Sequence, residues 1–292
     1  MRGRPGNGLR KAACGPVYDE HDGNCRRSRD LSEPPILYEA RDGVATVTLN
    51  RPEVLNAFTP EMLDLLHETI HRAAEEGQRA ILLTGAGRGF SAGQDLASIK
   101  DQYADGGPDF VSLLREHFHP VLRALRMVEL PVIAAVNGVA AGAGMSVALA
   151  CDVRIASANA RFATAFTKIG LVPDAGMAHT LPRLVGYGRA GWMLLQGEPV
   201  DAATALSIGL VSRVVEGDAL ASEAWALAQQ MAAGPTRAYV LTRQLLDSAA
   251  STSFDHLLDI EAEVQAAAGA TEDHRAAVAA FLAKQPPTFR GR

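Results

Sequence analysis

The 292-residue sequence has little of what marks membrane, disulfide-rich or nucleic-acid-binding proteins. Its three cysteines, Cys14, Cys25 and Cys151, are too few for a disulfide framework. No run approaches the roughly 20 apolar residues of a membrane span. The N-terminal arginines are not followed by the apolar segment of a secretory signal. The net charge of −5 argues against a basic face for nucleic acid. We therefore expect a cytoplasmic protein that binds neither nucleic acid nor membranes.

Aromatic residues and metal-binding patterns are also scarce. Only 5% of the residues are aromatic, while 48% are hydrophobic, so small aliphatic side chains must fill most of the core. Among the eight histidines, only His117 and His119 have a spacing that resembles metal ligation. They fall in a predicted helix, where residues i and i+2 do not share a face. We expect no metal and no separate cofactor.

The chain divides into three regions by its apolar pattern. Residues 1–34 are rich in Gly, Pro, Arg and Asp and have no apolar periodicity, which predicts a disordered extension. Residues 35–218 alternate between buried strands and helices, which predicts an α/β core with a largely parallel sheet. Residues 219–292 have a helical pattern without strands. The expected strands are residues 44–49, 80–84, 132–136, 153–156 and 211–215. The expected helices are residues 60–73, 110–128, 143–150, 219–233, 235–248, 254–268 and 272–283.

Two glycine-rich loops each follow a predicted buried strand and precede a helix, at residues 89–96 and 137–145. Glycines there let the backbone turn sharply and let a ligand approach main-chain N–H groups. A helix that begins near Ala143 would aim its amide groups at an anion. Together the loops could form an oxyanion hole from backbone donors, although each could also be only a tight turn.

Four blocks of sequence resemble the signature segments of the crotonase (enoyl-CoA hydratase/isomerase) superfamily, in order and at similar separations. They are residues 44–58 (VATVTLNRPEVLNAF), 90–96 (FSAGQDL), 131–152 (PVIAAVNGVAAGAGMSVALACD) and 162–176 (FATAFTKIGLVPDAG). The resemblance extends over residues 36–290. It implies a spiral of ββα units, a C-terminal helical region used for oligomerisation, and a homotrimer or homohexamer that acts on acyl-CoA substrates.

The resemblance also implies roles for individual residues. The thioester carbonyl would accept hydrogen bonds from the backbone N–H groups of Gln94 and Ala143. Coenzyme A would contact the backbone of Ala92 and the side chains of Phe281 and Lys284. The acyl pocket would include Met145, Ser146 and Phe166.

Two of these positions depart from the hydratases of the family. Ser146 and Phe166 stand where the resemblance implies glutamates that activate water, and neither can do so. Asp174 remains, and an aspartate in this sequence context resembles the phenylacetate-pathway branch, which contains epoxide isomerases and enoyl-CoA isomerases. A lone carboxylate beside an apolar pocket should have a raised pKa, which suits a base that takes and returns a proton. Asp174 could also simply cap a helix or close a turn.

We therefore expect an acyl-CoA isomerase that works through a thioester enolate, with Asp174 as its single base. The nearest alternative is an enoyl-CoA hydratase with a relocated base. A non-catalytic acyl-CoA binder would keep both loops. A serine hydrolase is the third alternative, because residues 144–148 resemble a nucleophile turn around Ser146 and Clp-type proteases share the fold.

Overall fold

The computed structural model describes residues 33–292, and residues 34–292 form one compact unit. Residues 1–32, which make up nearly all of the predicted extension, lie outside the described residues.

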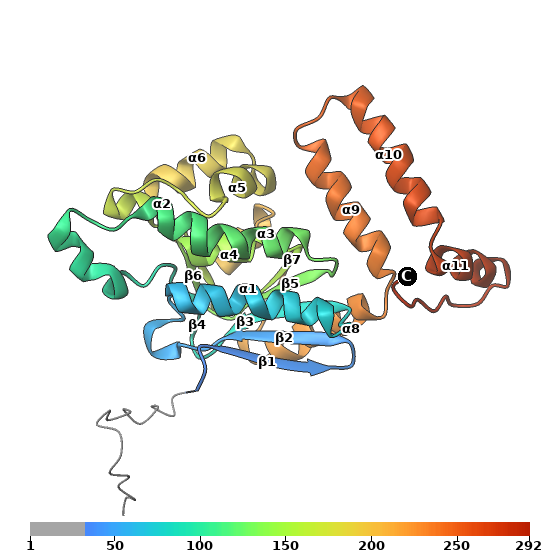
Figure 1. The fold of residues 1–292 in the computed structure, drawn as a ribbon, viewed down its shortest axis with the longest axis horizontal. Helices are drawn as coiled ribbons and strands as arrows, with labels where there is room; N and C mark the ends of the chain where they lie inside the picture. The colour runs from blue at the N-terminus through green and yellow to red at the C-terminus, as the bar shows by residue number, and fades with distance from the viewer. Residues whose placement is uncertain (1–32) are drawn as a thin grey trace, which may run out of the picture. The chain divides into compact units, whose positions relative to one another are not determined.

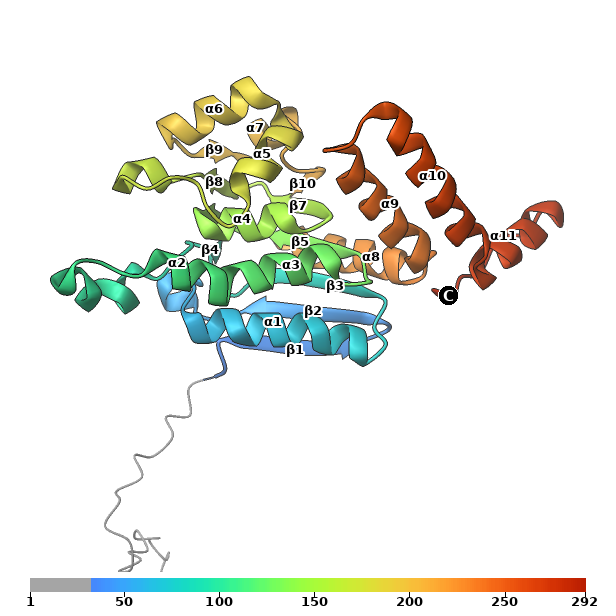
Figure 2. The same cartoon turned by 45° about the horizontal axis from the view of Figure 1, so that its top comes forward.

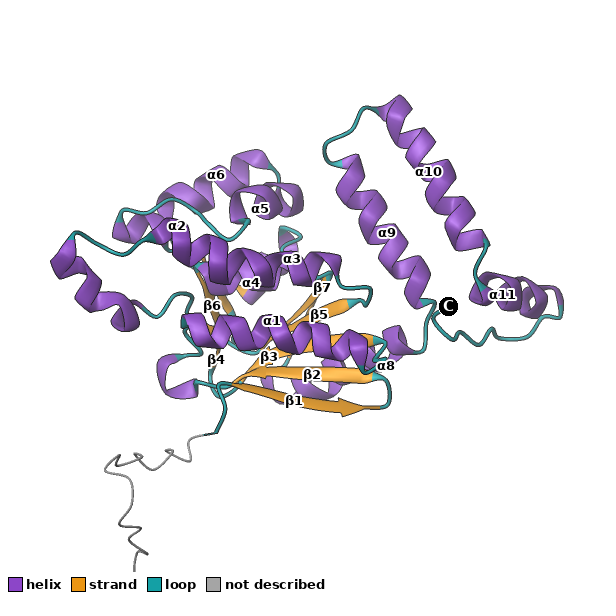
Figure 3. Ribbon diagram, in the orientation of Figure 1, coloured by secondary structure: helices purple, strands orange, loops and turns teal. Residues whose placement is uncertain are grey.

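The larger of two sheets among the described residues has six strands in the order β1-β2-β3-β5-β7-β10. Figures 1 and 3 show β1 to β7 of this order, and Figure 2 shows β10 as well. The strands are β1 (Ile36–Arg41), β2 (Val44–Leu49), β3 (Ala80–Gly85), β5 (Val132–Val136), β7 (Val153–Ser157) and β10 (Arg213–Val215). β1 and β2 form an antiparallel hairpin. From β2 onward, each strand of the sheet pairs in parallel with the next one in this order. The predicted parallel sheet is therefore present, with its last strand beginning two residues later than expected.

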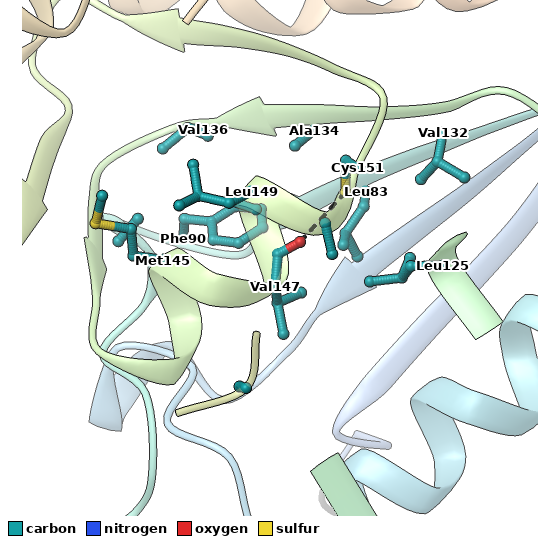
Figure 4. Packing of buried hydrophobic residues seen from close by; sticks show 14 of the residues in the cluster. Leu83, Phe90, Leu125, Val132, Ala134, Val136, Met145, Val147, Leu149 and Cys151 are labelled. Atoms are coloured by element: carbon teal, nitrogen blue, oxygen red, sulfur yellow. Dashed lines mark hydrogen bonds between the residues drawn. The ribbon is translucent and has the colours of Figure 1, made fainter. Parts of the chain in front are cut away.

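The central strands β3, β5 and β7 are buried between helices on the two faces of the sheet, which explains their continuous apolar runs. Side chains at alternate positions of β5 enter two separate cores. One core lies against α1 (Pro60–Glu75), α3 (His119–Met127) and α4 (Ala143–Ala150), and Figure 4 shows part of it. The other lies against α8 (Leu220–Ala232). In the first core the Cys151 thiol donates to the Val147 carbonyl at 3.5 Å, so this cysteine is a packed structural residue.

A second, smaller sheet contains short strands in the order β4-β6-β8-β9. They are β4 (Gly89–Ser91), β6 (Val139–Ala141), β8 (Arg161–Ala163) and β9 (Val200–Asp201). β4, β6 and β8 each follow a strand of the larger sheet, and β6 leads directly into α4. This repeat of long strand, short strand and helix agrees with the spiral of ββα units that the resemblance implies. The sequence did not predict the short strands themselves.

The helices match the apolar pattern closely. Thr59 caps α1 by accepting a hydrogen bond from Met62 N at 3.3 Å. The predicted helix at residues 110–128 consists of α2 (Phe110–Ser112), the π-helix η3 (Leu113–Phe118) and α3. No bounds were predicted for the remaining helical elements of the core. They are the 3-10 helices η1 (Pro52–Val54), η2 (Leu96–Asp105), η4 (Phe166–Ile169) and η5 (Gly217–Ala219), and the helices α5 (Met177–Val185), α6 (Tyr187–Gln196) and α7 (Ala202–Ser207).

The C-terminal region is helical, as predicted. After α8 come α9 (Thr236–Ala249), α10 (Phe254–Gly269) and α11 (Glu272–Leu282), and α9 packs beside α10 (Figure 2). Arg79, at the start of the sheet, donates to Gly234 O at 2.5 Å and to Phe289 O at 2.9 Å. These bonds tie the segment between α8 and α9, and the segment after α11, to the core. Its use in oligomerisation stays a prediction. No helix within residues 33–292 is both long and apolar enough to cross a bilayer.

Candidate active site

The two glycine-rich loops lie against each other, because β4 pairs in parallel with β6. A Cβ atom on Gly93 would lie 2.8 Å from Ala141 O and 3.2 Å from Ala143 N. A Cβ atom on Gly144 would lie 2.3 Å from Ser91 O. Any side chain at either glycine would therefore push the loops apart. Gly93 also has a φ of 92°, a conformation that favours glycine.

Each loop contains at least one backbone N–H group that is unpaired and belongs to a residue lining a common cavity. In the first loop, Phe58 N donates to Gly93 O and Asp95 N donates to Phe58 O, while Gln94 N between them has no acceptor within residues 33–292. In the second loop, Ala143 is the first residue of α4, where an N–H has no partner inside the helix, and it too has none elsewhere in the described chain. Both residues line the same cavity.

This cavity has a volume of about 260 Å³ and mostly apolar walls. The residues that line it are Ala92, Gln94, Leu96, Phe110, Leu113, Leu114, Phe118, Gly142, Ala143, Ala165, Phe166, Lys168, Ile169, Leu171 and Asp174. Lys168 is held at the cavity by an ion pair with Glu198 at 2.5 Å. Asp174 is the one acidic side chain among these lining residues.

The Asp174 carboxyl group is poorly satisfied. Its Oδ1 atom is buried and has no hydrogen-bond partner among the described residues. Burial raises the pKa of Asp174 from 3.8 to about 6, because the apolar surroundings disfavour the charged form. The side chain does not cap α5, whose N-cap is Gly176, so the alternative of a capping residue is wrong. Asp174 does close a turn, as the other alternative expected, but through its main chain: its carbonyl oxygen accepts from Met177 N at 3.0 Å. An unpaired carboxyl group in an apolar cavity is the arrangement expected of an acid–base group.

Ser146 and Met145 are placed differently. Both lie on α4 and are buried, but neither lines the cavity. The Ser146 hydroxyl donates to Asp174 O at 3.2 Å and lies 3.4 Å from Gly142 O. It therefore supports the main chain that carries Asp174. No hydrogen bond joins it to a histidine within the described chain, as a nucleophilic serine would need.

The predicted coenzyme A contacts are divided. Ala92 lines the cavity, next to the first loop's unpaired N–H group. Phe281 lies on α11 with 81% of its surface exposed, and Lys284 follows that helix; neither lines the cavity. Their role in binding coenzyme A stays a prediction.

A partly buried polar network that the sequence did not reveal supports the first loop. Arg51 donates to Asp95 Oδ2 at 2.9 Å and to Ala57 O at 2.6 Å. Asp95 also caps η2 by accepting from Ala97 N and Ser98 N, as its position before Leu96 suggests. Because Asp95 follows Gln94 directly, this network fixes the peptide that carries the first unpaired N–H group. Arg51 and Asp95 are 44 residues apart in the sequence, so no local sequence pattern predicts that they pair.

Within residues 33–292, no group of three or more His, Cys, Asp or Glu side chains is placed to hold a metal ion. His117 is paired instead with Asp64, Nδ1 to Oδ1 at 2.8 Å.

Comparisons with known proteins agree on one family. Residues 39–292 match the family model described as enoyl-CoA hydratase/isomerase. The 1,2-epoxyphenylacetyl-CoA isomerase of Escherichia coli (strain K12) is 42% identical over 258 residues, which cover 88% of this chain and 98% of that protein. The "Probable enoyl-CoA hydratase" of Rhodobacter capsulatus is 43% identical over 262 residues, covering 90% of this chain and 100% of the other. The crystal structure of an enoyl-CoA hydratase from Polaromonas sp. JS666 superimposes with a TM-score of 0.82 at 31% identity, covering 87% of this chain and 99% of that one.

Proposed function

Because this chain belongs to the enoyl-CoA hydratase/isomerase family and has the family's α/β crotonase fold, we propose that it is an acyl-CoA isomerase. It moves a double bond in the acyl group or rearranges a ring epoxide there. Asp174 is the single base, and the backbone N–H groups of Gln94 and Ala143 form the oxyanion hole. The observation that carries this proposal is the unpaired Asp174 carboxyl group in an apolar cavity shared with two unpaired N–H groups.

The reaction needs one base that works in both directions. The Asp174 carboxylate removes a proton from C2 of a 3-enoyl thioester, and the electron pair of the broken C–H bond delocalises onto the thioester oxygen. The N–H groups of Gln94 and Ala143 stabilise this enolate by hydrogen bonding. Asp174 then returns the proton to C4, which leaves the double bond between C2 and C3. A pKa of about 6 lets the carboxyl group both take and return a proton near neutral pH.

Hydration needs an additional group that holds water. Phe166 lines the cavity where the resemblance implies a glutamate, and the Ser146 hydroxyl is occupied by main-chain carbonyl groups. These features favour isomerisation. Hydration with Asp174 as a relocated base is the second candidate, because the similar Rhodobacter capsulatus protein is named as a hydratase.

A panel of 2-enoyl-, 3-enoyl- and epoxyphenylacetyl-CoA tests the proposal in deuterated water. We expect ultraviolet absorbance to report formation of the conjugated 2-enoyl thioester, and mass spectrometry to report deuterium incorporation without addition of water. A product heavier by one water would instead support the hydratase. Binding with neither deuterium exchange nor formation of the conjugated thioester would support a non-catalytic acyl-CoA binder, and labelling of Ser146 by a fluorophosphonate would support a hydrolase.

A further inference from the structure

One wall of the cavity comes from a helix that changes its hydrogen-bond register. The helix is continuous from α2 through the π-helix η3 to α3. His119 N donates to Leu114 O, five residues back, instead of the four residues of an α-helix. Phe110, Leu113, Leu114 and Phe118 of this segment line the cavity. The change of register therefore occurs inside the cavity wall.

The residue that follows the π turn accounts for it. Pro120 is the second residue of α3 and has no N–H group. In a regular α-helix its ring would clash with the carbonyl group of Glu116, four residues earlier. The π turn at Leu113–Phe118 is wider than an α turn, which leaves room for the proline ring beside the carbonyl groups of the preceding turn. The proline is thus accommodated inside a continuous helix.

The π turn also sets the direction of the side chains before it. A π turn holds one residue more than an α turn, and one residue corresponds to about 100° of rotation around a helix. After the turn, Val121 and Leu125 are buried in the core. Before it, Leu113 and Leu114 line the cavity. In an uninterrupted α-helix that kept Val121 and Leu125 in the core, these two leucines would point in a direction about 100° away.

Contacts hold the later part of the turn in place. The Phe118 ring packs edge-on against Phe58, with centroids 6.0 Å apart and planes at 86°. His117 Nδ1 lies 2.8 Å from Asp64 Oδ1 on α1. Because residues 117 and 118 are anchored, a change of register must displace the earlier residues, which include Phe110, Leu113 and Leu114.

We propose that Pro120 is a positioning residue that determines acyl-group specificity. By maintaining the π turn it holds Leu113 and Leu114 in the cavity wall, and so sets the size and shape of the acyl group that fits. Pro120 itself does not line the cavity. The inference rests on the proposed function only in assigning this cavity to the acyl group.

Pro120→Ala tests the inference because it makes the α register available without removing a hydrogen bond. The matched control is Pro182→Ala, which removes a proline from inside α5. The Pro182 side chain does not line the cavity. Calorimetry gives dissociation constants for coenzyme A and for saturated straight-chain and phenylacetyl thioesters. These ligands need no turnover, so a failure of the proposed isomerisation would not change the result. Hydrogen exchange of the backbone amides of residues 113–121 reports separately whether this segment has the π or the α hydrogen-bond register.

We expect Pro120→Ala to bind coenzyme A as the wild type does. The affinity ratio of phenylacetyl-CoA to butyryl-CoA should change by about tenfold or more, and exchange in residues 113–121 should slow as the α register forms. Pro182→Ala should keep the wild-type ratio. Leu114→Ala, which leaves Pro120 in place, should change the same ratio. An unchanged ratio in a folded Pro120→Ala protein, or a change of equal size in Pro182→Ala, would overturn the inference.

Discussion

The two ends of strand β5 differ in how their buried polar groups are paired. Before the strand, Asp152 Oδ2 accepts from Val132 N at 2.9 Å and from Arg243 at 3.0 Å. Arg243 also donates to the carbonyl groups of Leu130 and Val128. Beyond the strand, Ala143 N has no acceptor and Asp174 Oδ1 has no donor among the described residues. We call the first end closed, because its polar groups pair with one another, and the second end open, because these two groups lack partners within the described residues.

The difference distinguishes polar groups that stabilise the fold from polar groups that are available to a ligand. Leaving a buried polar group unpaired costs stability, so most such groups in folded proteins are paired. Around Asp152 the charged pair joins α9 to the sheet, and only Arg243 Nε lacks a partner within the described residues. Around Asp174 the unpaired groups gather at one cavity. Such a cluster is retained where a ligand supplies the missing partners.

The sharpest test of this contrast is Asp174→Asn. The amide keeps the size of the side chain but removes the proposed base, so the proposed isomerisation should fall by roughly 10²–10⁴-fold. Acyl-CoA affinity should change little, because the oxyanion donors remain. Steady-state kinetics and deuterium exchange at the substrate carbons measure both effects. A variant that isomerises near the wild-type rate would remove Asp174 from the mechanism.

Ala143→Pro tests the second open group. Ala143 is the first residue of α4, a position where proline is well tolerated, but the substitution removes the backbone N–H. The turnover number should fall by roughly 10²–10³-fold, as for loss of one oxyanion donor. Ala143→Gly is the matched control because it keeps the N–H group and should retain most activity. Equal losses in the two variants would point to packing and not to the donor.

At the closed end, Arg243→Met should affect stability and spare catalysis. It leaves buried carbonyl groups and Asp152 underpaired, so the free energy of unfolding should fall by roughly 2–4 kcal/mol. Arg237→Met, which breaks an exposed pair with Glu129, should cost about 1 kcal/mol or less. Urea denaturation measures both, and kinetics below the unfolding transition should show an unchanged turnover number. A large fall in turnover by the folded Arg243 variant would contradict the separation.

The smallest effect is the pH dependence of Asp174. Its folded pKa of about 6 lies above the ordinary value of 3.8, so the native state binds the proton more tightly than the unfolded state. This contribution to stability is complete below about pH 3.8 and is lost as the pH rises through about 6. The pKa difference of about 2 corresponds to roughly 3 kcal/mol at pH 7, and screening by solvent at this partly exposed group reduces it, so Asp174→Asn should be more stable by roughly 1–2 kcal/mol. The wild-type rate should rise to half its maximum near pH 6. Identical stability curves for the two proteins would show that burial does not perturb this carboxyl group.

Much of the fold follows from local sequence. The strand at residues 132–136 is apolar throughout because helices cover both faces of its sheet. Thr59 and Pro60 mark the start of α1 because a cap and a first-turn proline act locally. Three-residue strands such as β4 are too short to show periodicity. The π turn depends on where Pro120 falls relative to the core, which local pattern does not reveal.

The candidate site was only partly predictable. The loops and Asp174 came from motifs, and the structure brings Ala92, Gln94, Ala143, Phe166 and Asp174 around one cavity. Met145 and Ser146 do not line it. Every residue of α4 is buried, so the sequence does not show which of its faces meets the cavity. The Arg243–Asp152 pair joins residues 91 positions apart, and such pairs have no local signature.

The close contact of the two loops also constrains which substitutions the protein tolerates. In a library of all single substitutions, Gly93 and Gly144 should tolerate almost none, because even alanine would place its Cβ atom 2.8 Å from Ala141 O or 2.3 Å from Ser91 O. Phe110 and Leu114, in the helical wall of the cavity, meet no such limit. New acyl specificities can therefore accumulate on the helical wall while the backbone donors stay fixed. Divergent copies of this gene should differ at the wall and agree at the loops.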